Sequence, residues 1–361
     1  MTKNFFYIDK NQITVVKGIA IIMIVLHNFL HWTNSIGENE LEYNVTRLNS
    51  LYESILSNPA FILSGLFTYF GHFGVQLFVF VSAYGLTKKY LKANENIHYK
   101  EFILSRFLKI YSLVLVGLSV MFCVDVLYKQ SDFLLFLKNA LNVLLMINNF
   151  SYSKIFSYIG PWWFFSLILQ LYLIFPFIYR YIQDKREKGF YILLAVSYLF
   201  IYVLFPVAEK FNVPLFGNFL GHLPEFLFGI ALASFPKFEL NVKILLPALF
   251  FFILSNISAY AFPFSFLSVT ILLLALISPV FRLPQQNILL RFLLFTGKIS
   301  MFLFVINGPL RFLTLDFVED KSLLVIYIVA LLHLLIAIGI SYLISLIYDR
   351  TLLPLIQKVA T

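Results

Sequence analysis

A basic residue and a histidine share one long apolar segment near the start of the chain. Nine residues separate Lys17 from His27, and Asn28 follows directly. Residues 13–32 provide about the 20 residues that a helix needs to cross the hydrocarbon core of a membrane. Ionisable groups are costly to desolvate there and often mark functional sites. A neutral imidazole can take a proton from a hydroxyl and later return it, so His27 is a candidate general base. A purely structural hydrogen bond to a neighbouring helix is the alternative.

A second basic site lies in a later apolar segment. Arg106 and Lys109 are three residues apart and therefore share one face of a helix. An arginine fork matches the oxygens of a phosphate group. Together with Lys17, the two residues are candidates for holding a donor that carries several phosphates. The alternative is that these long side chains only reach back to the membrane surface.

Other polar or aromatic residues interrupt the apolar segments. His72 and Gln76 lie in a glycine-containing run, and small or polar residues often mediate contacts between membrane helices. Further candidate pocket residues are Trp162, Gln170, Glu225 and Asn307. Trp162 also fits an interfacial aromatic belt, and Glu225 is equally compatible with a structural pairing. We expect Asn28, His72 or Gln170 to orient the base or to hold developing negative charge.

Three further histidines are interpreted as structural, and no metal site is expected. His31 is interfacial, His98 lies in a loop and His333 stands alone in an apolar segment. Histidines with this spacing do not form a zinc-binding pattern. No phosphate-binding glycine loop or dinucleotide fingerprint occurs in the sequence.

The composition is that of an integral membrane protein. Hydrophobic residues make up 60% of the chain and charged residues 12%, against about 25% charged residues in globular proteins. The net charge of +9 does not indicate nucleic-acid binding, because the basic residues cluster in alternate loops, as the positive-inside rule requires. The single cysteine, Cys123, excludes an intrachain disulfide.

The elements that must position these residues are membrane helices. We expect an all-α, polytopic bundle of about ten spans with both termini cytoplasmic, formed by residues 1–361 as one membrane-embedded domain. The expected spans are 13–32, 66–87, 102–126, 161–179, 189–206, 218–235, 243–258, 264–281, 292–312 and 323–347. Residues 133–147 are interpreted as an interfacial or re-entrant helix rather than an eleventh span. The acidic loop 33–60 faces outward and is a candidate part of an acceptor site.

Taken together, these segments resemble the acyltransferase 3 family of integral membrane O-acyltransferases. The resemblance rests on the basic residue and histidine of the first span, the run 74–85, the paired basic residues before Ile110, the tryptophan-led segment 162–176 and the run 297–300. It covers nearly the whole chain, from Lys17 to Arg311. The family usually has one more residue between its basic residue and its histidine, so Asn28 occupies the expected histidine position.

The resemblance implies a multi-pass enzyme of the cytoplasmic (inner) membrane that works on the cell envelope. Its donor would be acetyl-CoA or another acyl-CoA in the cytoplasm. Its acceptor would be a hydroxyl of an extracytoplasmic glycan or lipid-linked glycan, as in O-acetylation of polysaccharides. A transporter or flippase of small molecules or lipid-linked sugars is the main alternative, because it would also need about ten spans with polar residues inside. A membrane scaffold without catalytic activity is a second alternative.

Overall fold

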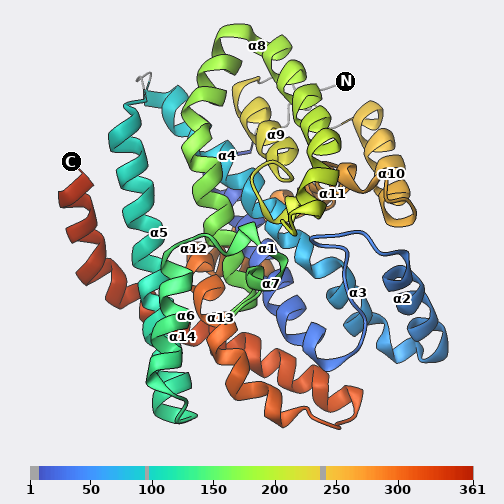
Figure 1. The fold of residues 1–361 in the computed structure, drawn as a ribbon, viewed down its shortest axis with the longest axis vertical. Helices are drawn as coiled ribbons and strands as arrows, with labels where there is room; N and C mark the ends of the chain where they lie inside the picture. Colours follow the sequence, from blue (N-terminus) through green and yellow to red (C-terminus); the bar gives the residue numbers. More distant parts are fainter. Residues whose placement is uncertain (1–7, 94–96, 236–240, 361) are drawn as a thin grey trace.

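Helices account for the whole regular architecture of this computed structural model, which describes residues 8–93, 97–235 and 241–360. No strand occurs in the described part of the chain, and this confirms the predicted all-α class. The α-helices, drawn in Figure 1, are α1 (Lys10–Leu30), α2 (Val45–Ser57), α3 (Ile62–Phe70), α4 (Gly74–Ala93), α5 (Tyr99–Phe122), α6 (Phe133–Leu144), α7 (Tyr152–Ile155), α8 (Trp163–Lys210), α9 (Leu223–Ser234), α10 (Val242–Ile257), α11 (Ser265–Ile277), α12 (Ile288–Lys298), α13 (Ser300–Thr314) and α14 (Leu323–Ala360).

Helix α1 lies in the middle of the bundle (Figure 1) and packs against α3, α4, α12, α13 and α14. It begins at a capping box, in which Asp9 accepts from the backbone N–H of Gln12 and the Gln12 side chain accepts from the backbone N–H of Asp9, both at 2.8 Å. Reciprocal bonds of this kind satisfy the free donors at a helix start. The first turn of α1 is therefore fixed, and the apolar residues that follow are held between neighbouring helices.

A glycine lets α12 approach α1 closely. A Cβ atom added at Gly297 would lie 1.9 Å from the carbonyl oxygen of Thr14, which is far inside van der Waals contact. Small residues at membrane helix contacts allow this backbone-to-backbone approach. The contact holds α1 against the α12–α13 unit and so fixes the face that α1 presents on its other side.

The number of long helices differs from the predicted ten spans. Seven helical segments in the described ranges are long and apolar enough to cross a membrane. Two predicted spans, 161–179 and 189–206, form the single helix α8, which bends at Arg186, where φ is 56°. The predicted spans 218–235 and 243–258 correspond to α9 and α10, of 12 and 16 residues. A hydropathy pattern marks apolar segments but does not fix where a helix starts, ends or bends.

Long apolar faces remain uncovered on the outside of the bundle. Along α14, large residues such as Leu331, Leu335 and Leu343 are about half exposed, and α8 shows the same for Leu199 and Val203. Soluble proteins rarely expose contiguous apolar surface of this extent. The helices and their apolar faces identify a multi-pass membrane protein. The short helix α6 matches the segment expected at the membrane interface, and its position relative to the membrane stays a prediction.

Candidate functional site

Two cavities lie at different levels along the same group of helices α1, α4, α8 and α13. The histidine cavity, of about 290 Å³, is lined by residues that include His27, Asn28, His31, Trp32, Glu38, Glu40, His72, Tyr158, Trp163, Phe304 and Arg311. The basic cavity, of about 240 Å³, is lined by residues that include Lys17, Lys89, Arg106, Lys109, Tyr172 and Met301. Ten positions along α1 separate Lys17 from His27, or about 15 Å.

His27 occupies the last turn of α1 and is 6% exposed. Its Nδ1 atom lies 3.1 Å from the carbonyl oxygen of Phe67 and 3.0 Å from that of Thr68. Carbonyl oxygens only accept hydrogen bonds, so Nδ1 carries the proton in the neutral ring. The lone pair is then on Nε2. A general base needs an unprotonated ring nitrogen of this kind, and the hydrogen bonds also fix the orientation of the ring.

His72 lies beside His27 in the short helix Gly71–Phe73, with 5.8 Å between the two ring centroids. A Cβ atom at Gly71 would lie 2.6 Å from the Cβ of His27, so only glycine allows this approach. Within the described part of the chain, neither ring nitrogen of His72 has a hydrogen-bond partner of normal geometry, although the residue is buried. A buried polar group usually has a partner. His72 lines the histidine cavity with both ring nitrogens buried and without a partner among the described residues.

The loop after α1 brings two carboxyl groups into the histidine cavity. Glu38 Oε2 lies 2.8 Å from Nδ1 of His31, and Glu40 is buried. Burial alone would raise the pKa of Glu38, but the contact with His31 and the nearby imidazoles lower it to about 2. Burial, and then the charge of Glu38, raise the pKa of Glu40 well above its usual range. The pKa values of the two carboxyl groups are thus shifted in opposite directions.

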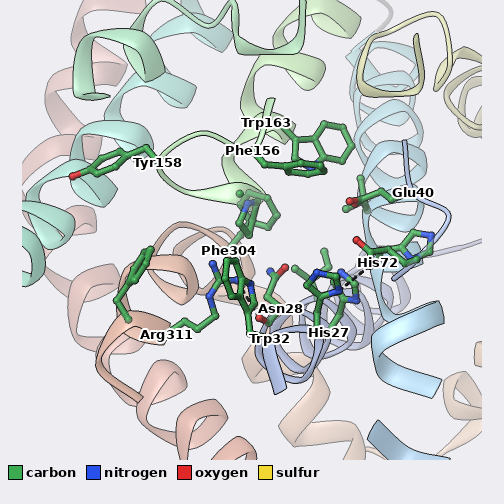
Figure 2. Close-up of a pocket in the computed structure, with 17 residues that line it drawn as sticks. His27, Asn28, Trp32, Glu40, His72, Phe156, Tyr158, Trp163, Phe304 and Arg311 are labelled. Atoms are coloured by element: carbon green, nitrogen blue, oxygen red, sulfur yellow. Dashed lines mark hydrogen bonds and ion pairs between the residues drawn. The ribbon is translucent and has the colours of Figure 1, made fainter. Parts of the chain in front are cut away.

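Arg311 places a buried guanidinium on the same cavity. Its Nη1 donates to the carbonyl oxygen of Asn28 at 3.0 Å, and its guanidinium lies 4.9 Å from the ring centroid of Trp32. The side-chain nitrogen of Asn28 is buried and has no partner among the described residues. In Figure 2, His27, Asn28 and Arg311 lie along one side of the cavity, and Phe156 and Trp163 face them. A cation held in a site of low dielectric can stabilise negative charge that develops during a reaction.

The basic cavity collects cations from three helices. Lys17 comes from α1, Lys89 from α4, and Arg106 with Lys109 from α5. The Arg106 guanidinium lies 5.5 Å from the ring centroid of Phe102 and 5.9 Å from that of Tyr172. None of the described residues that line this cavity is acidic. Four cations without a carboxylate on the cavity wall are suited to a ligand that carries several negative charges.

A layer of three phenylalanine rings separates the two cavities. Phe304 lines the histidine cavity, and Phe78 and Phe164 line the basic cavity. Their ring centroids lie 6.2 Å apart for Phe78 and Phe164, 6.4 Å for Phe78 and Phe304, and 5.2 Å for Phe164 and Phe304. These distances are typical of packed aromatic pairs. The three rings therefore form a packed contact between the linings of the two cavities.

The other predicted pocket residues line neither cavity. Oriented to match its surroundings, the Gln76 amide donates to the carbonyls of Phe73 and His72 at 3.2 and 3.3 Å, which supports the short helix that carries His72. Trp162 donates to the carbonyl of Val305, Gln170 donates to Asn218, and Asn307 contacts His333. These bonds join neighbouring segments of the bundle. The residues support the site from behind the cavity walls.

Glu225 forms a buried pair with His222. Its Oε1 lies 2.6 Å from Nδ1 of His222, and Nε2 of His222 lies 2.8 Å from the carbonyl oxygen of Phe216. The imidazole is stacked on Phe266, with ring centroids 4.8 Å apart. The sequence left open a structural pairing of Glu225 with another span, but the observed partner, His222, lies in the same expected span, 218–235, at the start of α9. Both groups are fully buried in this pair.

Four charged or imidazole side chains of the histidine cavity, those of His31, Glu38, Glu40 and Arg311, were not identified from the sequence as site residues. His31 follows His27 by four positions, and this i, i+4 spacing on one helix face was the available signal. The sequence indicated that the acidic loop 33–60 is a candidate part of an acceptor site, but it did not single out Glu38 or Glu40. In the sequence, Arg311 was noted only as the last residue of the range over which the family resemblance extends. Its contact with Asn28 joins residues that are 283 positions apart, and no local spacing encodes it.

Comparison with known proteins gives one match. Residues 10–350 match a family model described as an acyltransferase domain. The matched range begins at the first residue of α1, ends in α14, and includes every residue named above for the two cavities. Neither the comparison with curated proteins nor the comparison with solved structures found a match.

Proposed function

The chain belongs to the acyltransferase 3 family, and we propose that it transfers an acyl group, most simply acetyl, from acyl-CoA to a hydroxyl of an extracytoplasmic glycan. The observation that carries this proposal is the pairing of the two cavities. One presents a free imidazole nitrogen on His27, and the other presents four cations from α1, α4 and α5. A base at one end and a polyanion site at the other are what acyl transfer from a nucleotide-bearing thioester needs.

In the proposed reaction, Nε2 of His27 takes the proton of the acceptor hydroxyl. The hydroxyl oxygen attacks the thioester carbonyl carbon, and the carbonyl oxygen becomes negatively charged. In this proposal that charge is stabilised by the guanidinium of Arg311 and an N–H of His72, two residues that line the cavity. As the carbon–sulfur bond breaks, the imidazolium of His27 returns the proton to the thiolate. The products are the acylated acceptor and free CoA, and His27 is neutral again.

In this proposal the donor binds with its phosphates in the basic cavity. Lys17, Arg106 and Lys109 hold the phosphate groups, and the acyl-bearing arm extends along α1 towards His27. The arm crosses the layer of Phe78, Phe164 and Phe304, so these rings must separate when the donor binds.

We further propose that the chain crosses the cytoplasmic (inner) membrane ten times, with both termini in the cytoplasm. Contacts between basic connections support this sidedness. Arg180 donates to the carbonyl of Ile97, which joins the basic turn of α8 to the segment between α4 and α5, and Tyr84 donates to the carbonyl of Ile8. In Figure 1 the bend of α8 and the start of α5 lie at the same end of the bundle. Basic connections favour the cytoplasmic side.

Cysteine labelling tests this topology. In a Cys123→Ser background, cysteines placed at the exposed positions Lys92 and Lys185 should resist an impermeant thiol reagent in intact cells. A cysteine at exposed Glu53 of α2 should react, and permeabilised cells should show that all three are reactive. Labelling at position 92 in intact cells would contradict the proposed orientation.

Proteoliposomes separate an acyltransferase from a transporter. Purified protein is supplied with acyl-CoA labelled in the acyl group, with a mixture of cell-envelope glycans as acceptor. We expect label on the glycan, together with an equal amount of free CoA, because the thioester is consumed in the reaction. A transporter would instead move a glycan or CoA across the membrane and leave the thioester intact. Movement without loss of thioester would rule out the proposed function.

A further inference from the structure

A third cavity lies beside the loop that carries Glu38 and Glu40. It has a volume of about 790 Å³ and is formed by that loop, by α7, by the last turns of α8 and by the segment between α10 and α11. The four tyrosines in its wall are Tyr43, Tyr152, Tyr202 and Tyr260, and the two carboxylates are Glu42 and Glu209. We refer to it as the tyrosine cleft.

The tyrosine cleft combines flat apolar rings with hydrogen-bonding groups. The Tyr260 side chain is 85% exposed and that of Tyr202 is 41% exposed, so their rings are available to a ligand. Tyr202 donates from its hydroxyl to the backbone carbonyl of Tyr260, which ties α8 to the opposite wall. A sugar ring has an apolar face that can stack on an aromatic ring and hydroxyls that bond to carboxylate and phenol oxygens.

An aromatic belt at the membrane surface is the ordinary explanation for tyrosines at helix ends. A belt would point its rings outward to the lipid headgroups, without grouping carboxylates among them. Here Tyr152 lies among Glu42 and Glu209, which come from different segments. Burial, and then the negative charges of these two residues, raise the pKa of the Tyr152 hydroxyl to about 12. The two carboxylates and the phenol therefore face one shared space.

The loop joins the tyrosine cleft to the histidine cavity. Glu40 lines the histidine cavity and Glu42 lines the cleft. Two residues of extended chain span at most about 7 Å. Arg47 holds this part of the loop through bonds to the carbonyls of Glu38 and Glu42, at 2.9 and 3.1 Å. A bonded chain from Asn39 through Tyr69 to Asn256 connects it to α10. The two sites therefore border one fixed segment.

The charge of the cleft limits what it can bind. None of the described residues that line it is basic. Arg47 lies outside the lining and pairs with Glu42 at 2.6 Å, which leaves Glu209 as the unneutralised charge of the cleft. Like charges brought together in a partly desolvated site repel each other. Uronate or phosphate groups are therefore disfavoured, and hydroxyl or amino groups are favoured.

We propose that the tyrosine cleft binds the acceptor of the reaction, a neutral or amino-substituted oligosaccharide whose reacting sugar reaches from the cleft past the loop into the histidine cavity. This inference rests on the proposed function for the identity of the reaction, and it adds the place and the charge class of the acceptor. Tyr260 and Tyr202 stack on sugar rings, and Glu209 accepts hydrogen bonds from hydroxyl or ammonium groups.

Binding of three hexasaccharides to the full chain in phosphatidylcholine nanodiscs, whose lipids carry no net charge, tests the proposal. The hexamers of glucose, glucosamine and galacturonic acid differ in charge, and calorimetry gives their dissociation constants. We expect the first two to bind and the third to bind at least tenfold more weakly. Tyr260→Ala should weaken binding of the glucose hexamer about tenfold, as expected for a contact ring in a binding site. Tyr128→Ala is the control, because Tyr128 is 71% exposed and lies outside the cleft.

Glu209→Gln separates charge selection from stacking. It should weaken binding of the glucosamine hexamer more than that of the glucose hexamer, and it should improve binding of the galacturonic acid hexamer. Equal affinities for all three hexamers, no binding of any, or no effect of either cleft substitution would overturn the inference. If glycan acylation still occurs in that case, the proposed function survives. If binding depends on the cleft but no acyl transfer is detected, the tyrosine cleft remains a binding site for oligosaccharides and the proposed acyltransferase function is wrong.

Discussion

Replacing His27 with alanine is expected to lower acyl transfer by about 10²–10⁴-fold, the usual contribution of general base catalysis. The imidazole is the cavity group whose tautomer is fixed by hydrogen bonds, with Nδ1 directed to the carbonyls of Phe67 and Thr68 and Nε2 left to accept a proton. The loss should appear in kcat, with donor binding retained. Initial rates with labelled acyl-CoA and an acceptor glycan measure it. In the wild-type protein the rate should fall on acidification, because a protonated imidazole has no lone pair to accept a proton.

His333→Ala is the matched control for this substitution. His333 is also a buried histidine in a membrane helix, but it contacts Asn307 and Thr314 and lines neither described cavity. Its loss should leave the rate of transfer within a few-fold of that of the wild type. Asn28→Ala tests whether His27 or Asn28 occupies the catalytic position of the first span. If Asn28→Ala abolishes transfer while His27→Ala remains near wild type, the assignment of the base to His27 is wrong.

Replacing Arg106 with alanine is expected to raise the KM for acyl-CoA by about 10- to 100-fold. A hydrogen bond to a charged group contributes about 1.5–3 kcal/mol, and each 1.4 kcal/mol changes an affinity about tenfold. The contribution of Arg106 should shrink as salt is added, because ions screen attraction between the guanidinium and phosphate. The wild-type KM should therefore rise with salt more steeply than that of Arg106→Ala. Initial rates over a range of acyl-CoA and salt concentrations measure both effects.

Arg291→Ala serves as the control for the loss of a basic residue. Arg291 is exposed in the first turn of α12 and does not line the basic cavity. Its replacement should leave the KM for acyl-CoA unchanged. An unchanged KM for Arg106→Ala, measured on protein that elutes as the folded wild type does, would mean that Arg106 only extends to the membrane surface. A lower kcat with an unchanged KM would also contradict a role in donor binding.

The sequence alone predicted the features that depend on composition and on spacing within one helix. The apolar content predicted a helical membrane protein, and the family match covers nearly the same range as the resemblance. The distance from Lys17 to His27 follows from the rise of a helix. The shared face of Arg106 and Lys109 follows from their spacing, and the structure places both on the basic cavity. Each of these relations is set within a single segment, where the geometry is nearly constant.

The tertiary structure decided which polar groups meet. Arg311 reaches Asn28, and the loop after α1 brings Glu38 and Glu40 to the histidine cavity. It also decided that Glu225 pairs with His222 away from both cavities. Hydropathy shows that a polar residue is buried but not which partner satisfies it, because the partner depends on the rotation and approach of helices far apart in the chain. A glycine contact such as that of Gly297 with Thr14 sets this approach, and its effect becomes visible only when both helices are in place.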